Sequence, residues 1–207
     1  MPDIDIRGPF RSVKRLVLAS ASPRRQTLLT SLGISFFVRP SRIKEPPPQP
    51  GEMPGDYVLN MARLKAEDTA KREKDSVVLG ADTAVVLEKE IMGKPGDEDH
   101  ALEMLSNLSG REHEVISGIF ITGDAIKEDK GFTVSTAVHM NSFSAEILKA
   151  YINTGETWDK AGAYAMQGAG GFLVDHIRGS YTNVIGLPLA EVVRKLVKLG
   201  TIAPEDN

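Results

Sequence analysis

Short apolar runs alternate with segments of helical periodicity along most of the chain. The first run, Leu16–Leu18, predicts a buried strand, and small or hydroxyl-bearing residues follow it at positions 19–22. Pro23 then suits the first position of a helix, because its missing N–H has no helical partner there. Leucines at helical spacing and a closing glycine come next, at Leu28, Leu29, Leu32 and Gly33. This stretch predicts a strand, a tight turn and a helix N-terminus.

The same alternation continues to the C-terminus. Residues 57–72 and 144–152 carry apolar side chains at helical spacing, as do the residues after Pro188. A proline-rich loop over residues 45–55 and a glycine-rich stretch over residues 162–171 interrupt the pattern. Apolar or β-branched runs predict strands over residues 34–38, 76–87, 115–122, 132–143 and 172–174. The pattern predicts an α/β fold without internal repeats.

Two arginines, Arg24 and Arg25, lie in the predicted first turn of the helix that starts at Pro23. Positive side chains are unfavourable there, since the N-terminus of a helix already carries partial positive charge. The placement is explained if an anion binds at the turn, where backbone N–H groups, the hydroxyls of Ser20 and Ser22, and two guanidinium groups could donate to it. The alternative is a surface turn with two solvated arginines, and this stretch alone favours neither interpretation.

A carboxylate, Asp82, ends the apolar run Val77–Ala81, and a buried charge is costly unless it is paired. Because ligands of open α/β sheets bind at strand ends, Asp82 is the strongest candidate from pattern alone, with a turn or capping residue as the alternative. Lys65 continues the apolar face of the helix over residues 57–72, and Lys94 lies on irregular chain close in sequence to Asp82. Each lysine either extends into solvent or points into a polar cleft.

Two loop residues are further candidates. Glu45 opens the proline-rich loop, which is either a plain linker or a flap whose carboxylate binds a metal ion or water. Gln167 lies among glycines, which allow close backbone approach, and its amide offers both donor and acceptor groups. The glycines do not form a G-x-G-x-x-G pattern after a strand, so the signal for a Rossmann fold is weak. None of the histidines shows metal-ligand spacing, and we expect no metal ligand among His100, His113, His139 and His176.

Composition narrows the classes of function. The 207 residues carry a formal net charge of −3 with a pI of about 5.9, so the overall field does not favour nucleic acid as a partner. The absence of cysteine excludes disulfides and thiolate chemistry. No apolar run approaches the ~20 residues of a membrane-spanning helix, and residues 1–15 lack the apolar segment of a secretory signal. We therefore expect a cytoplasmic protein without a membrane partner.

Six short motifs occur in order along the chain: Ala19–Arg25, Gly80–Thr83, Gly93–Pro95, Leu108–Gly110, Asp159–Tyr164 and Gly186–Leu189. Each is weak alone, but the ordered set resembles the Maf family of nucleoside triphosphate pyrophosphatases. The resemblance implies an α/β fold, in which an elongated mixed sheet flanked by helices forms two lobes around a central nucleotide-binding cleft, as in Maf and ITPase-like proteins. It also implies hydrolysis of a nucleoside triphosphate to the monophosphate and pyrophosphate with a divalent metal, Mg²⁺ or Mn²⁺.

The resemblance also assigns roles to residues. Asp82 matches the family's proton acceptor, Lys65 and Lys94 are further catalytic residues, and Asp82 with Glu45 would bind the metal. The substrate-binding or specificity positions are Ser20, Arg24, Arg25, Thr83 and Gln167. Thr83 after the aspartate and Gln167 in the glycine-rich stretch are similar to the branch that acts on dTTP and UTP, with modified pyrimidine nucleotides as further candidates. The chain departs from the family pattern at Lys44, Leu64 and Met166, and the first of these bears on metal binding.

The matched span predicts one domain over residues 15–200, with an N-terminal extension over residues 1–14 and a C-terminal tail over residues 201–207. The expected ligand is a nucleoside triphosphate, and a homodimer is a candidate assembly. The alternative function is a nucleotide-sensing or septum-related binding protein with little catalysis, which could dispense with Asp82. The enzymatic hypothesis requires that Asp82 meet four cations in one cleft, namely Arg24, Arg25, Lys65 and Lys94.

Overall fold

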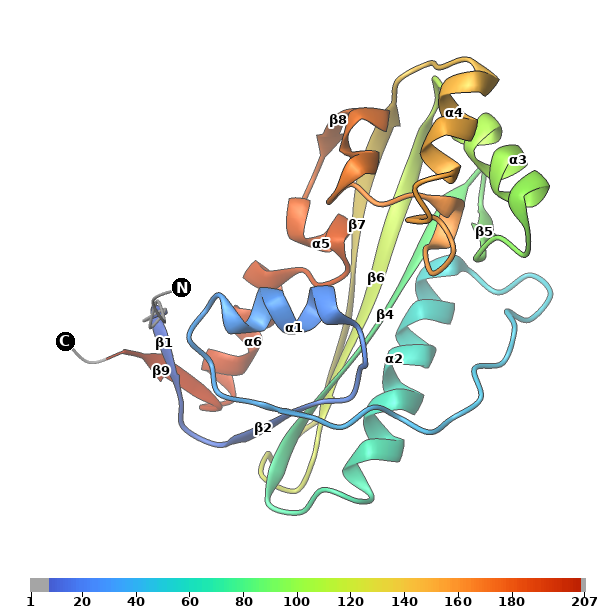
Figure 1. The fold of residues 1–207 in the computed structure, drawn as a ribbon. Helices are drawn as coiled ribbons and strands as arrows, with labels where there is room; N and C mark the ends of the chain where they lie inside the picture. The colour runs from blue at the N-terminus through green and yellow to red at the C-terminus, as the bar shows by residue number, and fades with distance from the viewer. Residues whose placement is uncertain (1–7, 206–207) are drawn as a thin grey trace.

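The centre of the fold is a seven-stranded mixed sheet (Figure 1), and the computed structural model describes residues 8–205. The strands are β2 (Arg15–Leu18), β3 (Phe37–Val38), β4 (Ser76–Leu87), β5 (Glu90–Met92), β6 (Glu112–Thr122), β7 (Lys130–Met140) and β8 (Val174–Arg178). They lie in the order β3-β2-β4-β6-β7-β8, with β5 paired to part of β4. β2 is parallel to β3 and β4, and the other pairs are antiparallel. The expected mixed α/β architecture is confirmed.

Helices cover both faces of this sheet. One face packs against α2 (Pro54–Ala70), which approaches so closely that a Cβ at Gly80 or Gly118 would overlap its backbone. The opposite face packs against α1 (Pro23–Thr30), α3 (Glu98–Leu108), α4 (Ala145–Ile152) and α6 (Leu189–Lys198). Among the described residues, no helix is both long and apolar enough to span a bilayer.

The face opposite α2 carries two separate apolar cores, which define two lobes. In the first core, α1 and α6 pack on Leu79 of β4. In the second core, α3 and α4 pack on Val85 of the same strand. Because side chains alternate along a strand, Thr83 lies on the same face between these two positions. The long strand β4 therefore runs through both lobes, and its middle residues lie where the lobes meet.

The middle of β4 has an edge without a strand partner. Ser76–Leu79 pairs with β2 on this edge, and Val85–Leu87 pairs with β5. Between them, residues 80–84 have no strand partner on this edge within the described chain, whereas β6 pairs with them on the other side. Ligands of open α/β sheets bind where neighbouring strands diverge in this way. Asp82 and Thr83 lie in this gap, so Asp82 is in the interior of β4 and not at the strand end that the sequence predicted.

Both ends of the described chain differ from the sequence expectation. β1 (Phe10–Ser12) pairs antiparallel with β9 (Ile202–Pro204), so parts of the expected extension and tail form a two-stranded sheet. This pairing is non-local, and segments of three residues are too short to show a periodicity that predicts it. The remaining ends, residues 1–7 and 206–207, lie outside the described residues.

Element boundaries also differ from the sequence expectation. The strand expected over residues 34–38 is only Phe37–Val38, and the one expected over residues 132–143 is Lys130–Met140. The helix expected over residues 57–72 is α2, which begins at Pro54 in the first helical position and ends at Ala70. Residues 181–185, for which the sequence pattern predicts no helix, form α5 (Tyr181–Ile185), and the side chain of Ser180 caps its N-terminus. The strand expected over residues 172–174 begins only at Val174, because the preceding residues form the 3₁₀ helix η2 (Ala169–Leu173).

His113 on β6 is a buried polar residue in the second core, where it is 3% exposed. Its Nε2 lies 2.7 Å from the hydroxyl of Tyr164, and its Nδ1 has no hydrogen-bond partner among the described residues. Burial lowers the pKa of His113 from 6.5 to about 4. The imidazole is therefore neutral in the folded protein at neutral pH.

We expect acid to destabilise the fold through His113. Between pH 6.5 and about 4, the unfolded chain binds a proton here that the folded chain does not, so the free energy of unfolding falls by up to about 3 kcal/mol. Urea unfolding at a series of pH values measures this loss. It should shrink in His113→Gln and remain in the control His100→Gln, which changes an exposed histidine. Equal pH slopes in all three proteins would contradict this assignment.

Candidate active site

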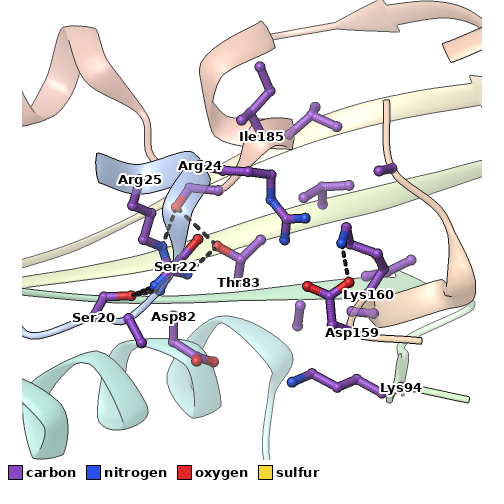
Figure 2. A pocket seen from close by; sticks show the side chains of 18 of the residues that line it. Ser20, Ser22, Arg24, Arg25, Asp82, Thr83, Lys94, Asp159, Lys160 and Ile185 are labelled. Atoms are coloured by element: carbon purple, nitrogen blue, oxygen red, sulfur yellow. Dashed lines mark hydrogen bonds and ion pairs between the residues drawn. The ribbon is translucent and has the colours of Figure 1, made fainter. Parts of the chain in front are cut away.

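A cavity of about 780 Å³ opens at the gap between the two lobes. Its lining includes every residue that the sequence singled out for the site, namely Ser20, Arg24, Arg25, Glu45, Lys65, Asp82, Thr83, Lys94 and Gln167. These residues come from the turn before α1, the first turn of α1, the proline-rich loop, α2, β4, the segment after β5 and the glycine-rich stretch. Asp82 and the four cations therefore meet in one cleft, part of which is drawn in Figure 2.

Asp82 and Glu45 converge on the ammonium group of Lys65. The Nζ atom lies 2.7 Å from Asp82 Oδ1 and 2.8 Å from Glu45 Oε1. The side chains of Lys65 and Asp82 are only 12% and 13% exposed, whereas that of Glu45 is 54% exposed. Of the two interpretations of Lys65, the structure supports the polar cleft. The proline-rich loop is also more than a linker, because Glu45 attaches its start to α2.

The environment of Asp82 makes it an unusual aspartate. Burial raises its pKa above the ordinary value of 3.8, although the nearby charges of Lys65 and Arg25 act in the opposite direction. The ionised carboxylate is therefore poorly solvated and binds a proton more readily than a surface aspartate does. A carboxylate of this kind beside a cavity is suited to accept a proton from a bound water molecule.

The expected metal ligands, Asp82 and Glu45, can both reach a single cation, as their shared contact with the Lys65 ammonium demonstrates. Carboxylate oxygens are ligands that Mg²⁺ and Mn²⁺ prefer. The donor set therefore fits a hard divalent cation. Lys44, the departure from the family pattern next to Glu45, is exposed and is not part of the cavity lining.

Arg25 is buried, and most of its donors bind protein acceptors. Nη1 donates to Ser20 Oγ at 3.0 Å and to the Ala81 carbonyl at 2.9 Å. Nε donates to the Gly186 carbonyl at 2.8 Å, and Nη2 donates to Thr83 Oγ1 at 3.1 Å. Four of the five N–H groups of a guanidinium are thus used. Since Ala81 belongs to the unpaired edge of β4, Arg25 supplies a donor that a neighbouring strand would otherwise provide.

Three other cations are directed toward a common space. Figure 2 shows Arg24, Lys94 and Lys160 extending into the cavity from different segments, with Asp159 paired to Lys160. Lys160 was not identified from the sequence as a site residue. It belongs to the motif Asp159–Tyr164 that contributed to the family resemblance, so that motif was the available signal.

The cavity lining is positive although the chain is acidic overall. Its charged side chains comprise five cations and three carboxylates, whereas the whole chain has a net charge of −3. The cations are Arg24, Arg25, Lys65, Lys94 and Lys160, and the carboxylates are Glu45, Asp82 and Asp159. An excess of positive side chains in a cleft attracts anionic ligands. The arrangement therefore suits a polyanion with a carboxylate base beside it.

Side-chain hydrogen bonds anchor both ends of residues 165–170, the segment that carries Gln167. Glu156 accepts backbone N–H groups of Ala169 and Gly170, at 2.9 and 3.1 Å. The hydroxyl of Tyr151 accepts the N–H of Ala165 at 3.1 Å. The bonds from the backbone lower the pKa of Glu156, so its carboxylate is ionised at neutral pH. No sequence pattern pointed to this support, because both anchoring side chains lie outside the glycine-rich stretch.

Comparison with known proteins finds close sequence similarity. The family described as Maf-like protein matches residues 15–199. A dTTP/UTP pyrophosphatase of Oleidesulfovibrio alaskensis is 44% identical over 97% of this chain and 92% of its own length. Proteins with the same description are 49% identical in Geobacter sulfurreducens, over 91% of this chain and 98% of that protein, and 47% identical in Geotalea uraniireducens, over 93% and 99%.

Proposed function

Because the chain belongs to the Maf-like protein family, we propose that it hydrolyses dTTP and UTP to the nucleoside monophosphate and pyrophosphate. The observation that carries the proposal is a carboxylate with a raised pKa, Asp82, in a cavity whose lining is positive. The choice of dTTP and UTP is supported by the descriptions of the relatives, which are 44% to 49% identical to this chain.

In the proposed mechanism, Asp82 accepts a proton from the water molecule that attacks the substrate. The water oxygen bonds to the α-phosphorus, the bond from that phosphorus to the oxygen that bridges to the β-phosphorus breaks, and pyrophosphate leaves with the bridging oxygen. Lys65, 2.7 Å from Asp82, stabilises the ionised carboxylate before it takes the proton. The buried position of both side chains strengthens this interaction relative to the same pair in water.

The cations of the cavity would neutralise the polyphosphate. Arg24, Lys94 and Lys160 can donate charge-assisted hydrogen bonds to phosphate oxygens, which gain charge as the anhydride bond breaks. Asp82 and Glu45 would hold Mg²⁺ or Mn²⁺, which supplies further neutralisation of the phosphate oxygens when bound. Arg25 has a positioning role, because its N–H groups donate hydrogen bonds that orient the side chains of other residues in the cavity lining.

Gln167 would recognise the nucleobase of the substrate. Its amide can pair with the N3–H and O4 edge of uracil or thymine, because it offers one acceptor and one donor group. Gln167 is exposed, so discrimination requires that the bound base shield the amide from water. A base without this edge would then leave the amide partly unpaired, which costs binding energy. Modified pyrimidine triphosphates that keep the N3–H and O4 edge are further substrates under this proposal.

We expect Glu156→Gln to weaken discrimination between pyrimidine and purine triphosphates. The glutamine amide has only one acceptor oxygen for the two N–H groups of Ala169 and Gly170, so the segment that carries Gln167 loosens. Since a hydrogen bond to a charged group contributes about 1.5–3 kcal/mol, KM for dTTP should rise roughly tenfold, with a smaller change in kcat. Steady-state kinetics with dTTP and GTP measures both effects. The exposed control Glu146→Gln should match the original protein, and an unchanged dTTP preference in Glu156→Gln would oppose this role.

A panel of triphosphates with Mg²⁺ or Mn²⁺, scored separately for pyrophosphate and orthophosphate, tests the function. We expect pyrophosphate from dTTP and UTP at rates well above those from ATP, GTP and CTP. Release of orthophosphate as the first product would refute cleavage of the α–β bond. Saturable stabilisation by dTTP without turnover would instead support the sensor.

The nucleotide-sensing or septum-related alternative is not favoured. A nucleotide sensor requires the positive lining and Gln167 to bind its ligand. It does not require a general base such as Asp82, which is buried and contacts Lys65, itself paired with Glu45. The cytoplasmic location, the homodimer and the absence of nucleic-acid and membrane partners stay predictions. The single domain over residues 15–200 also stays a proposal, with its bounds close to the matched residues 15–199.

A further inference from the structure

Two histidines that are distant in sequence lie side by side at the edge of the sheet. His139 on β7 and His176 on the edge strand β8 are directly paired across the antiparallel ladder. Their rings are stacked, with centroids 5.0 Å apart and an interplanar angle of 11°. Figure 1 shows β8 beside β7, and none of these side chains lines the cavity of about 780 Å³.

A β-bulge brings a carboxylate to the same place. The register shifts between His139 and Met140, whose partners are His176 and Val174, so Asp175 is the extra residue of β8. A bulge interrupts the alternation of side chains and re-aims the extra residue. Asp175 Oδ2 lies 2.9 Å from Nδ1 of His176 and 3.6 Å from Nδ1 of His139. One ligand atom from each of the three residues lies within 4.8 Å of the others.

The chemistry of this group differs from that of the cleft. Two imidazole nitrogens and one carboxylate oxygen form a ligand set for Zn²⁺ and for other transition-metal cations, whereas Mg²⁺ prefers oxygen ligands alone. With metal–ligand bonds of about 2.0–2.1 Å, tetrahedral geometry places neighbouring ligand atoms roughly 3.3 Å apart. The separations of 2.9 and 3.6 Å lie on either side of this value.

The surroundings leave the three side chains available to an ion. The Nδ1 atom of His139 is buried and has no hydrogen-bond partner among the described residues. The stacked rings must turn before both Nδ1 lone pairs meet at one ion, and exposures of 37% for His139 and 59% for His176 leave room for this. Glu112, the neighbour of His139 on β6, is already paired with Arg178 at 3.1 Å.

We propose that His139, Asp175 and His176 form a binding site for a divalent transition-metal ion of the Zn²⁺ type, separate from the catalytic cleft. The ion would tie the edge strand β8 to β7, with a water molecule as its fourth ligand. The expectation that neither histidine is a ligand depended on local spacing, and the strand register supplies the proximity that spacing lacks.

Titration calorimetry with ZnCl₂ on the full chain tests the site, in a buffer with excess Mg²⁺ so that Zn²⁺ does not occupy the carboxylates of the cleft. We expect one equivalent to bind, and His176→Ala or Asp175→Asn to weaken binding roughly tenfold or more, because each removes one of three ligands. The matched control His100→Ala removes an exposed histidine elsewhere and should bind Zn²⁺ as the original protein does. Asp82→Asn should also leave this isotherm unchanged, which separates the site from the cleft.

Thermal unfolding supplies a second readout. Zn²⁺ should raise Tm of the original protein and of His100→Ala, but not of His176→Ala, because only a ligand bound to the folded state stabilises it. Equal Tm values without Zn²⁺ show that His176→Ala is folded. Binding that His176→Ala leaves unchanged would overturn the proposal. A lack of binding at about 100 μM Zn²⁺ would also overturn it, leaving an ordinary aspartate–histidine pair.

Discussion

Asp82→Asn is expected to reduce pyrophosphate release from dTTP by about 10²- to 10⁴-fold, the usual contribution of a positioned general base. The amide keeps the shape of the side chain but cannot accept the proton of the attacking water. The substitution also removes one of the two carboxylates that would hold the divalent cation. Single-turnover kinetics at saturating dTTP measures the effect on the chemical step.

Stability should move in the opposite direction to activity. Because the folded state raises the pKa of Asp82, the ionised carboxylate lowers the free energy of unfolding at pH values above the unfolded pKa. Asp82→Asn removes this unfavourable contribution of the buried charge to stability, so the Tm of the variant should equal or exceed that of the original protein. The exposed control Asp129→Asn should change neither activity nor Tm. More than about a tenth of the original activity in Asp82→Asn would exclude the role of general base, since that role accounts for a hundredfold or more.

Arg25→Lys is expected to lower the free energy of unfolding by about 3 kcal/mol or more, since each hydrogen bond to a charged group contributes about 1.5–3 kcal/mol. One ammonium group cannot reach four acceptors that lie on different elements around the buried guanidinium. The carbonyls of Ala81 and Gly186 would compete for it with two hydroxyls. Urea unfolding at neutral pH measures the loss, and pyrophosphate release should fall as the cavity wall loosens.

Arg24→Lys is the matched control, because the same substitution is made at the adjacent residue. Arg24 is only partly buried and extends into the cavity (Figure 2), so its replacement should leave the unfolding free energy nearly unchanged. Its effect should appear as a higher KM for dTTP, because a lysine replaces a bidentate phosphate contact with a single charge. Equal losses of stability in the two variants would refute the distinction between them.

Local signals predicted part of the site well. The strand, turn and helix over residues 15–30 followed from an apolar run, small residues and Pro23, all within a few positions. Asp82 could be identified because a charge that follows directly on a buried apolar run requires a partner, although the strand continues through it to Leu87. The partner itself could not be identified. Lys65 lies on another element, and its place in the sequence is compatible both with a side chain in solvent and with one that points into a polar cleft.

Residues that act from behind the cavity wall escaped prediction. Glu156 and Tyr151 bind backbone N–H groups of the segment around Gln167, and such bonds leave no pattern in side-chain hydrophobicity. The group at His139, Asp175 and His176 depends on a strand register and a bulge, neither of which local spacing records. Arg25 had looked equivalent to Arg24 because they are adjacent and chemically identical.

The sequence by itself determined the α/β class, the order of the main elements and the residue types available for chemistry, because these depend on neighbours along the chain. Only the tertiary structure decided how those residues are divided among tasks. Arg24 extends into the cavity whereas Arg25 closes the gap in β4, and Lys65 joins Asp82 to Glu45. The physical reason is that burial and hydrogen-bond partners are set by segments that meet only after the sheet has formed, and these determine whether a charge is free to bind a ligand.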